Sequence, residues 1–164
     1  MKKALLSLLA IFAMLLWLSA CSDDSTSPED IPDTGSVSGT VTFTGTWPSN
    51  GDIQVSIYTG LNPPYIPMGP PEQATDPIPA NTGTYSFKFE GLEKTTYSAV
   101  FVGWRDPGDP TASRLLGMYW TDPNATGIDP MTGLPQAAPT TITIDNDHID
   151  ITGINLTGDL DLAP

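Results

Sequence analysis

Apolar and polar positions alternate most clearly between Gly83 and Val102. In residues 84–90 aromatic residues occupy every second position and polar residues stand between them. This period of two is typical of a strand with one buried face. A second run, residues 97–102, begins at Tyr97 and places apolar residues on both faces. Because only a short polar turn separates the runs, we predict that they form a β-hairpin at the centre of the core.

The same alternation predicts five further strands. They cover residues 36–45, 52–59, 114–120, 140–144 and 149–156. The segments 60–81 and 121–139 are predicted to be long loops of the kind that is usually functional or mobile. The first of them carries seven prolines, which cannot donate to a sheet ladder.

Seven short strands separated by turns predict an all-β fold. Beyond the first twenty residues no run of ten positions shows a helical stripe, so helices are not expected. We predict a seven-stranded antiparallel two-sheet sandwich over residues 36–157, followed by a tail over residues 158–164.

The amino terminus has the pattern of a bacterial export signal. Two lysines precede an uncharged apolar run, residues 4–18, which is shorter than a typical membrane span. Leu18-Ser19-Ala20-Cys21 follows and resembles the lipobox of bacterial lipoproteins. The resemblance implies that residues 1–20 are a signal peptide and that Cys21, the only cysteine, becomes acylated. An uncleaved anchor and an ordinary signal peptide with an incidental cysteine are the alternatives.

Residues 21–35 join this leader to the predicted sandwich. They are acidic and poor in apolar residues, so we expect a lipidated cysteine followed by a disordered linker. The acidic patch after Cys21-Ser22 resembles the surface-export signals of some outer-membrane lipoproteins. Position 22 is serine rather than aspartate, which fits the usual inner-membrane retention signal poorly. The predicted location is therefore the cell outer membrane, where at least two acyl chains on Cys21 would hold the protein durably. The sequence leaves open which face of this membrane bears the domain, and exposure on the cell surface is one alternative.

Two segments carry a second resemblance. Ser38-Gly39-Thr40-Val41, and then Gly83-Thr84-Tyr85-Ser86-Phe87 with Gly91-Leu92 and Tyr97, are similar to the carboxypeptidase regulatory-like domain. Domains of that family are transthyretin-like (prealbumin-like) sandwiches of seven strands. Residues 88–90 look inserted, and Thr95-Thr96 replace the usual glycine. These motifs are structural, so the resemblance implies a fold and not an activity.

The charge of the chain bears on its partners. Six basic and 19 acidic side chains give a formal net charge of −13. Such a surface repels phosphate backbones and anionic headgroups, so nucleic acid is excluded as an expected partner. The ordinary effect of this charge is solubility.

The sequence offers no catalytic signature. His148 is the only histidine, and no Gly-x-Ser-x-Gly elbow accompanies it. Some enzymes of the wider transthyretin-like fold use several histidines and an Arg-Gly-Ser tail, whereas this chain ends Asp-Leu-Ala-Pro. A carboxylate pair for sugar hydrolysis would need a cleft that a sequence cannot display. We therefore predict a protein that is not an enzyme.

Metal binding is predicted only as an alternative. One histidine and one cysteine exclude an ordinary zinc site. Asp145, Asp147 and Asp150, or Asp106 with Asp109, supply the hard oxygen ligands that calcium prefers. Aspartates also favour turns by bonding their own backbone. The prediction is no cofactor, with calcium at Asp145, Asp147 and Asp150 as the alternative.

Five aromatic residues at or beside predicted loops are candidate ligand-binding residues: Trp47, Tyr65, Trp104, Tyr119 and Trp120. Flat rings in such places stack on sugars or anchor protein partners, although they also cap the open ends of sandwiches. The predicted function is a lipid-anchored, non-enzymatic β-sandwich module of the cell envelope with a structural or protein-interaction role. The alternative is a surface lipoprotein that binds polysaccharide through these aromatic residues.

Overall fold

Nine strands form the part of the chain that the structure describes, residues 32–164 of a computed structural model. The strands are β1 (Thr34–Thr44), β2 (Asp52–Tyr58), β3 (Gln73–Ala74), β4 (Thr84–Glu93), β5 (Thr96–Tyr97), β6 (Ala99–Asp106), β7 (Asp109–Met118), β8 (Ile142–Thr143) and β9 (Asp150–Asp159), and a short 3₁₀ helix, η2 (Leu160–Leu162), follows them. No helix in this range has the length and apolar character needed to cross a membrane. The predicted signal peptide, Cys21 and the linker as far as Ile31 lie outside the described residues.

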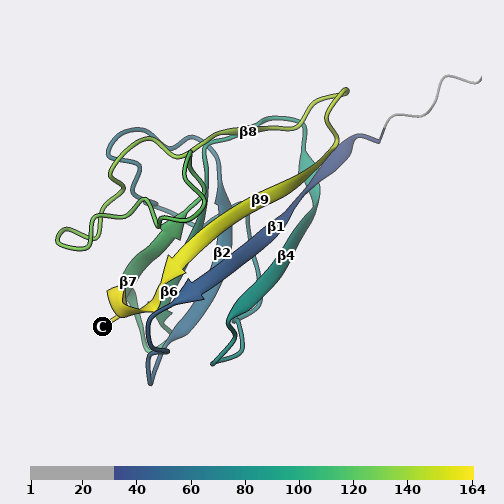
Figure 1. Cartoon of the computed structure of the whole chain (residues 1–164). Helices are drawn as coiled ribbons and strands as arrows, with labels where there is room; N and C mark the ends of the chain where they lie inside the picture. Colours follow the sequence, from purple (N-terminus) through teal and green to yellow (C-terminus); the bar gives the residue numbers. More distant parts are fainter. Residues whose placement is uncertain (1–31) are drawn as a thin grey trace, which may run out of the picture. The chain divides into compact units, whose positions relative to one another are not determined.

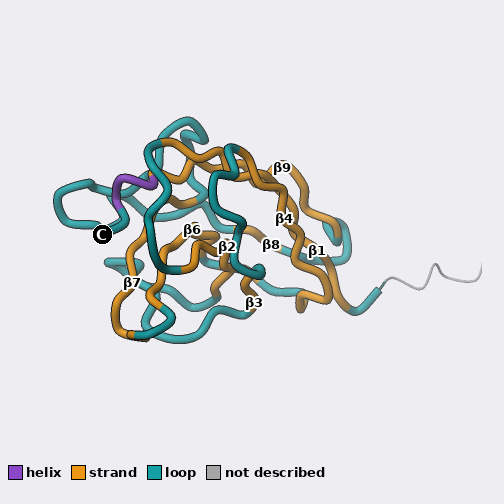
Figure 2. Tube along the Cα trace, turned by 90° about the horizontal axis from the view of Figure 1, so that it is seen from below, coloured by secondary structure: helices purple, strands orange, loops and turns teal. Residues whose placement is uncertain are grey.

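The prediction of an all-β sandwich is confirmed. One sheet has the strand order β4-β1-β9 and the other the order β3-β2-β6-β7, while β5 and β8 form a small separate pair. Figure 1 shows β9, β1 and β4 running side by side, with β2, β6 and β7 behind them. In the view of Figure 2, β3, β2, β6 and β7 lie on one side of the domain and β1, β4 and β9 on the other.

The main core lies between the two larger sheets. Because successive side chains of a strand point to opposite faces, each strand contributes every second residue to this core. The buried residues include Val37, Val41, Ile53, Val55, Ile57, Phe87, Phe89, Val102 and Leu156. Ser86, Lys88 and Glu90 point the other way and are exposed. The predicted alternation of β4 is thus confirmed.

The predicted hairpin between residues 84–90 and 97–102 is wrong. β4 pairs with β1, whereas β6 pairs with β2 and β7 in the other sheet. The chain crosses between the sheets through β5, where Tyr97 is buried and its hydroxyl donates to the carbonyl of Glu93 at 3.1 Å. The two strands lie in different sheets because they differ in burial. β6 is apolar on both faces and is therefore stable in the centre of a sheet that is covered on both sides. β4 has one solvent-exposed face.

The carboxyl terminus also departs from prediction. β9 pairs with β1 in parallel, so the sandwich is not wholly antiparallel. Residues 158–164 are not a tail outside the sandwich, because β9 runs to Asp159 and Leu160 of η2 is buried. A parallel pair needs a long connection between its strands. Here almost the whole domain lies between them, and β9 forms one edge of the three-stranded sheet.

The two predicted loops are held against the four-stranded sheet. The 60–81 segment contains β3 and follows the edge of β2, where backbone N–H groups of Glu72, Thr75 and Ile78 donate to β2 carbonyls at 2.8–2.9 Å. The 121–139 segment covers the outer face of the sheet. Ile128 packs there with Ala99, Phe101 and Met118 in a second core cluster.

Two further predicted strands have different bounds in the structure. β7 begins at Asp109 rather than at residue 114, so that it meets β6 directly at the Asp106–Asp109 turn. β8 comprises only Ile142–Thr143 and pairs with β5 rather than with either larger sheet. Its partner β5 is equally short.

Candidate functional site

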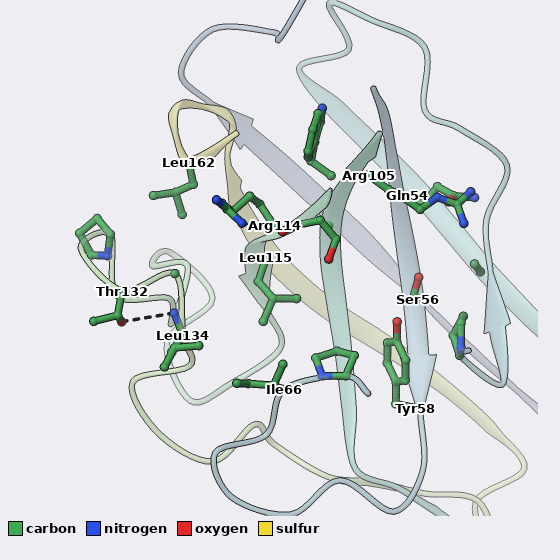
Figure 3. A pocket seen from close by; sticks show the side chains of 18 of the residues that line it. Gln54, Ser56, Tyr58, Ile66, Arg105, Arg114, Leu115, Thr132, Leu134 and Leu162 are labelled. Carbon is green, nitrogen blue, oxygen red and sulfur yellow. Dashed lines mark hydrogen bonds between the residues drawn. The ribbon is translucent and has the colours of Figure 1, made fainter. Parts of the chain in front are cut away.

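A groove of about 670 Å³ crosses the outer face of the four-stranded sheet. Its floor comes from β2, β6 and β7, and its walls come from the 60–72 and 128–136 loops and from η2. Figure 3 shows Gln54, Ser56 and Tyr58 in a row along β2, with Arg114 and Leu115 between that row and the loop that bears Thr132 and Leu134. The groove is therefore built from four separated stretches of the chain.

The 128–136 loop is a tight, internally bonded wall. The backbone N–H of Asp129 donates to the carbonyl of Leu134 at 2.8 Å, and the backbone N–H of Gly133 donates to the carbonyl of Asp129 at 2.7 Å. Gly133 has φ +71°, a backbone conformation that favours glycine. Ile128, at the base of the loop, packs in the second core cluster. These contacts hold Met131 at the tip of the loop with 94% of its side chain exposed.

The 60–72 loop forms the opposite wall. Ile66, Pro67 and Pro71 line the groove from this side. The backbone N–H of Tyr65 donates to the carbonyl of Asn62 at 2.7 Å and closes a turn just before Ile66. At the end of the loop the hydroxyl of Thr59 donates to the Glu72 carboxylate. Both walls are thus shaped before any ligand arrives.

The floor combines polar groups with a neutral phenol. Partial burial raises the pKa of Tyr58 above 10.0, although the hydrogen bond with Ser56 and the charge of Arg105 oppose the shift. Tyr58 therefore keeps its proton at neutral pH and remains a hydrogen-bond donor. Its ring packs edge-on against Phe101, with the centroids 5.9 Å apart. The ring is consequently part of the wall of the second core cluster.

The five predicted aromatic residues do not form one platform. Trp104 is 4% exposed, and its indole N–H donates to the carbonyl of Asn50 at 2.8 Å. Trp47 packs against Phe43 with ring centroids 5.2 Å apart. Tyr65 is half-buried in the 60–72 loop.

Tyr119 and Trp120 do come together at a second, smaller hollow. This hollow has a volume of about 360 Å³, and Asn155 of β9 also lines it. Both rings are half-buried. The Trp120 indole N–H is already used, since it donates to the carbonyl of Ala125 at 2.9 Å.

The predicted calcium ligands have separate roles, and Asp145 serves as a turn former. One oxygen of Asp145 accepts from the backbone N–H groups of Asp147 and His148 at 2.9 and 2.8 Å, and the His148 ring lies 3.0 Å away. Asp150 instead accepts from the hydroxyl of Ser36 at 2.7 Å. Within residues 32–164 no three potential metal ligands form a group. The structure does not bring Asp145, Asp147 and Asp150 together.

The alternative acidic pair lies on the β6–β7 turn. Asp106 accepts from the backbone N–H of Gly108 at 2.8 Å. Asp109 accepts from the hydroxyl and the backbone N–H of Thr111, and these bonds lower the pKa of Asp109. Each carboxylate thus accepts hydrogen bonds from residues of the turn to which it belongs.

Sequence reasoning missed the groove itself. Its most distinctive residues, Arg105 and Arg114, stand on neighbouring strands that the pattern alone did not pair. One signal was present: these are the only two arginines of an acidic chain. A methionine at the tip of a loop, Met131, is a second signal, because methionine is common at adaptable binding surfaces.

Together, these observations describe an all-β sandwich domain with an open groove on its four-stranded sheet. Comparisons of the chain with profiles of known protein families, with curated proteins and with solved structures returned no match.

The shape of the 128–136 loop is expected to depend on pH. The backbone N–H of Met131 donates to the Asp129 carboxylate at 2.8 Å and lowers the pKa of Asp129 from its ordinary 3.8. Since the folded pKa lies below the unfolded one, this contact stabilises the loop above pH 3.8 and is lost as the pH falls through the folded pKa. The Met131 amide resonance should therefore titrate with a midpoint below pH 3.8. Asp129→Asn should abolish the titration, and a midpoint at or above 3.8 would contradict the assignment.

Proposed function

We propose that this protein is a non-enzymatic module of the cell envelope, held by lipid on Cys21, whose sandwich domain binds a protein partner. The observation that carries the binding role is the groove on the four-stranded sheet. It joins apolar side chains, two arginines and a row of polar groups between preshaped walls. Mixed surfaces of this kind, with exposed methionine and arginine, are typical of protein-binding sites.

The composition of the groove favours binding over catalysis. Nucleophilic catalysis needs a nucleophile within hydrogen-bonding reach of a base. The residues that line the groove include Ser56, Ser113 and Thr132, but their one carboxylate is Asp161, and no histidine or cysteine is among them. The Asp161 carboxylate accepts from the backbone N–H of Thr46 at 2.9 Å. His148 lies instead on the turn between β8 and β9.

We also propose that the sandwich is of the transthyretin-like type found in carboxypeptidase regulatory-like domains. The motifs around Gly39 and Tyr85 support this assignment, and they fall on the paired strands β1 and β4. Three and four strands in the two larger sheets are compatible with a seven-stranded sandwich. The proposed location is the outer membrane, with the domain joined to the lipid by residues 22–31. The lipobox and the acidic residues after Cys21 support this location.

Cys21→Ser should release the protein from the membrane. The substitution removes the thiol that the proposed acylation requires, and without acyl chains the polar linker has little affinity for a bilayer. We expect the wild-type chain in the membrane fraction of expressing cells and the variant in the soluble fraction. Ser22→Ala keeps the cysteine and should stay with the membrane. A Cys21→Ser variant that still sediments with membranes would contradict the lipid anchor.

Site-specific photo-crosslinking tests the binding role. A photoreactive amino acid at Met131 would stand at the rim of the groove, and one at Thr152 would stand exposed on β9 as a control. We expect a discrete crosslinked protein band in cells from position 131 and none from position 152. Equal bands from both positions, or no band from either, would argue against a groove-bound partner.

Polysaccharide binding remains the second candidate function. It is favoured by one observation, the hollow that Tyr119 and Trp120 share with Asn155. A saturable change in tryptophan fluorescence on addition of one polysaccharide, lost in Tyr119→Ala, would establish it. The same response in the Tyr119→Ala variant would exclude this hollow as the sugar site.

A further inference from the structure

We propose that β4 pairs with β4 of a second copy of this chain, so that two sandwiches share one continuous antiparallel sheet. This inference goes beyond the proposed function, because it concerns the edge of the three-stranded sheet and not the groove. Three features carry it: an edge with unpaired backbone groups, a side-chain pattern that is symmetric about Phe87, and an opposite edge that is already covered.

The outer backbone groups of β4 have no partner in the described part of the chain. β4 pairs with β1 on one side and forms the edge of its sheet (Figure 1). The backbone N–H of Phe43 donates to the carbonyl of Gly83 at 2.9 Å, so Gly83 directs its backbone groups toward β1. Because this direction alternates along a strand, Thr84, Ser86 and Lys88 direct their backbone groups away from β1. Such an edge is a template for another strand.

The open edge ends near Glu90. The carbonyl of Glu90 accepts from the side-chain amide of Gln73 at 2.8 Å, and its second lone pair can accept another hydrogen bond. Beyond Glu90 the pairing with β1 becomes irregular, and Gly91 has φ +67°. Residues 84–90 therefore form a regular edge about 20 Å long.

This regular edge has nearly the same pattern in both directions about Phe87. Aromatic residues alternate with polar ones on each side of it. A two-fold axis at Phe87 would set Ser86 opposite the second copy's Lys88, and Thr84 opposite the second copy's Glu90. Each of these pairs joins outward-directed backbone groups, so each can exchange two hydrogen bonds. An axis at Lys88 would instead set like charges opposite each other, which is destabilising.

The inner face of the edge would gain a matching row of rings. Phe87 and Phe89 are buried in the main core, with their ring centroids 5.4 Å apart. Tyr85 packs against the same core and is only half-buried. About the axis at Phe87, Tyr85 faces the second copy's Phe89. Cross-strand aromatic pairs stabilise antiparallel sheets, and this pairing would cover more of Tyr85.

The charge of the edge is balanced, although the chain is acidic. The ammonium group of Lys88 forms an ion pair with the carboxylate of Glu90 on the same strand. At physiological salt, charges farther away than about 8 Å are largely screened. Two copies can therefore approach each other through β4 in spite of their net negative charge. Acylation of Cys21, as proposed above, would also concentrate the copies on one membrane.

The pairing is expected to stop at two copies. A two-fold interface uses the β4 edge of both chains and leaves neither of these edges free. At the opposite edge of the sheet β9 lies against β7, where a Cβ at Gly117 would stand 1.9 Å from the carbonyl oxygen of Thr157. The hydroxyl of Thr157 also donates to the carbonyl of Pro123 at 2.8 Å. Since the groove lies on the other large sheet, the dimer would present two grooves.

Cysteine crosslinking in the membranes of expressing cells tests the pairing. About the axis at Phe87, the two copies of Ser86 are diagonal neighbours, roughly 7–8 Å apart. Ser86→Cys should therefore give a covalent dimer with a short bismaleimide, whereas Thr152→Cys, exposed on β9, should give little. The wild-type chain shows any background from Cys21. Equal dimer yields from positions 86 and 152 would indicate random collisions and overturn the proposal.

A proline at position 86 separates pairing from folding. The N–H of Ser86 is directed away from β1, and proline is tolerated at such positions of an edge strand. In a non-ionic detergent of matched density, we expect the full wild-type chain and Ser86→Ala to sediment as dimers. Ser86→Pro should sediment as a monomer with an unchanged circular dichroism spectrum. A folded Ser86→Pro variant that remains dimeric would overturn the proposal.

A charge variant provides the test if Ser86→Pro does not fold. Lys88→Glu leaves the backbone unchanged and removes the cation that balances Glu90. The dimer dissociation constant should rise at least about tenfold at low salt, and the effect should shrink in about 1 M salt. A dissociation constant equal to that of the wild type would contradict the pairing.

Other occupants of the edge would give different results. If Ser86→Cys crosslinks to another protein and forms no dimer of this chain, the edge binds a foreign strand and the proposal is wrong. In Ser86→Pro the crosslinks from position 131 should persist, because the groove lies on the other sheet. The pairing and the proposed function can therefore fail independently.

Discussion

Gly39→Ala should destabilise the domain by about 3 kcal/mol, the upper end of the usual cost of overpacking. Gly39 lies in the central strand of its sheet, between Phe87 of β4 and Ile154 of β9. A Cβ at this position would stand 1.8 Å from the carbonyl oxygen of Ile154. The obstacle is backbone in a paired strand, so it cannot turn aside as a side chain would. Urea denaturation followed by circular dichroism would measure the loss.

Gly83→Ala is the matched control. A Cβ at Gly83 meets nothing within 4 Å, and its φ lies outside the left-handed region. We therefore expect its free energy of unfolding to stay within about 0.5 kcal/mol of the wild type. If Gly39→Ala were as stable as this control, the close contact between β1 and β9 would be wrong.

Phe101→Ala should cost about 3–5 kcal/mol, the usual loss for a large core aromatic residue. Phe101 is 1% exposed and fills the second core cluster with Ala99, Met118 and Ile128. Because Ile128 fastens the 128–136 loop, the cavity should also loosen one wall of the groove. Amide hydrogen exchange at Asp129 and Gly133, whose N–H groups close that loop, should become faster than global unfolding explains.

Met131→Ala is the control for this second effect. It removes a side chain of the same loop that is 94% exposed, so we expect a change within about 0.5 kcal/mol. A Phe101→Ala variant with unchanged exchange at Asp129 would mean that the loop does not depend on the second core cluster.

The sequence pattern could not predict most of the candidate site. The residues of the groove come from β2, β6, β7 and two loops, and nothing local links Ser56 to Arg114 or to Leu134. The aromatic residues were a reasonable expectation, but the core took Trp104 because a large ring gains most from burial. Tyr119 and Trp120 were brought together because they are adjacent and follow the end of β7. Asp106, Asp109 and Asp145 instead accept hydrogen bonds within their own turns, as local bonding favours.

The sequence by itself determined the all-β class and the alternation of inward and outward side chains along β1, β2 and β4. These features are local, since alternation with a period of two acts over a few residues. The tertiary structure decided which strands pair. It separated β4 from β6, set β9 parallel to β1 and drew the carboxyl terminus into the sandwich. Those choices depend on burial summed over residues far apart in the chain, and the same long-range packing assembled the groove from three strands and two loops.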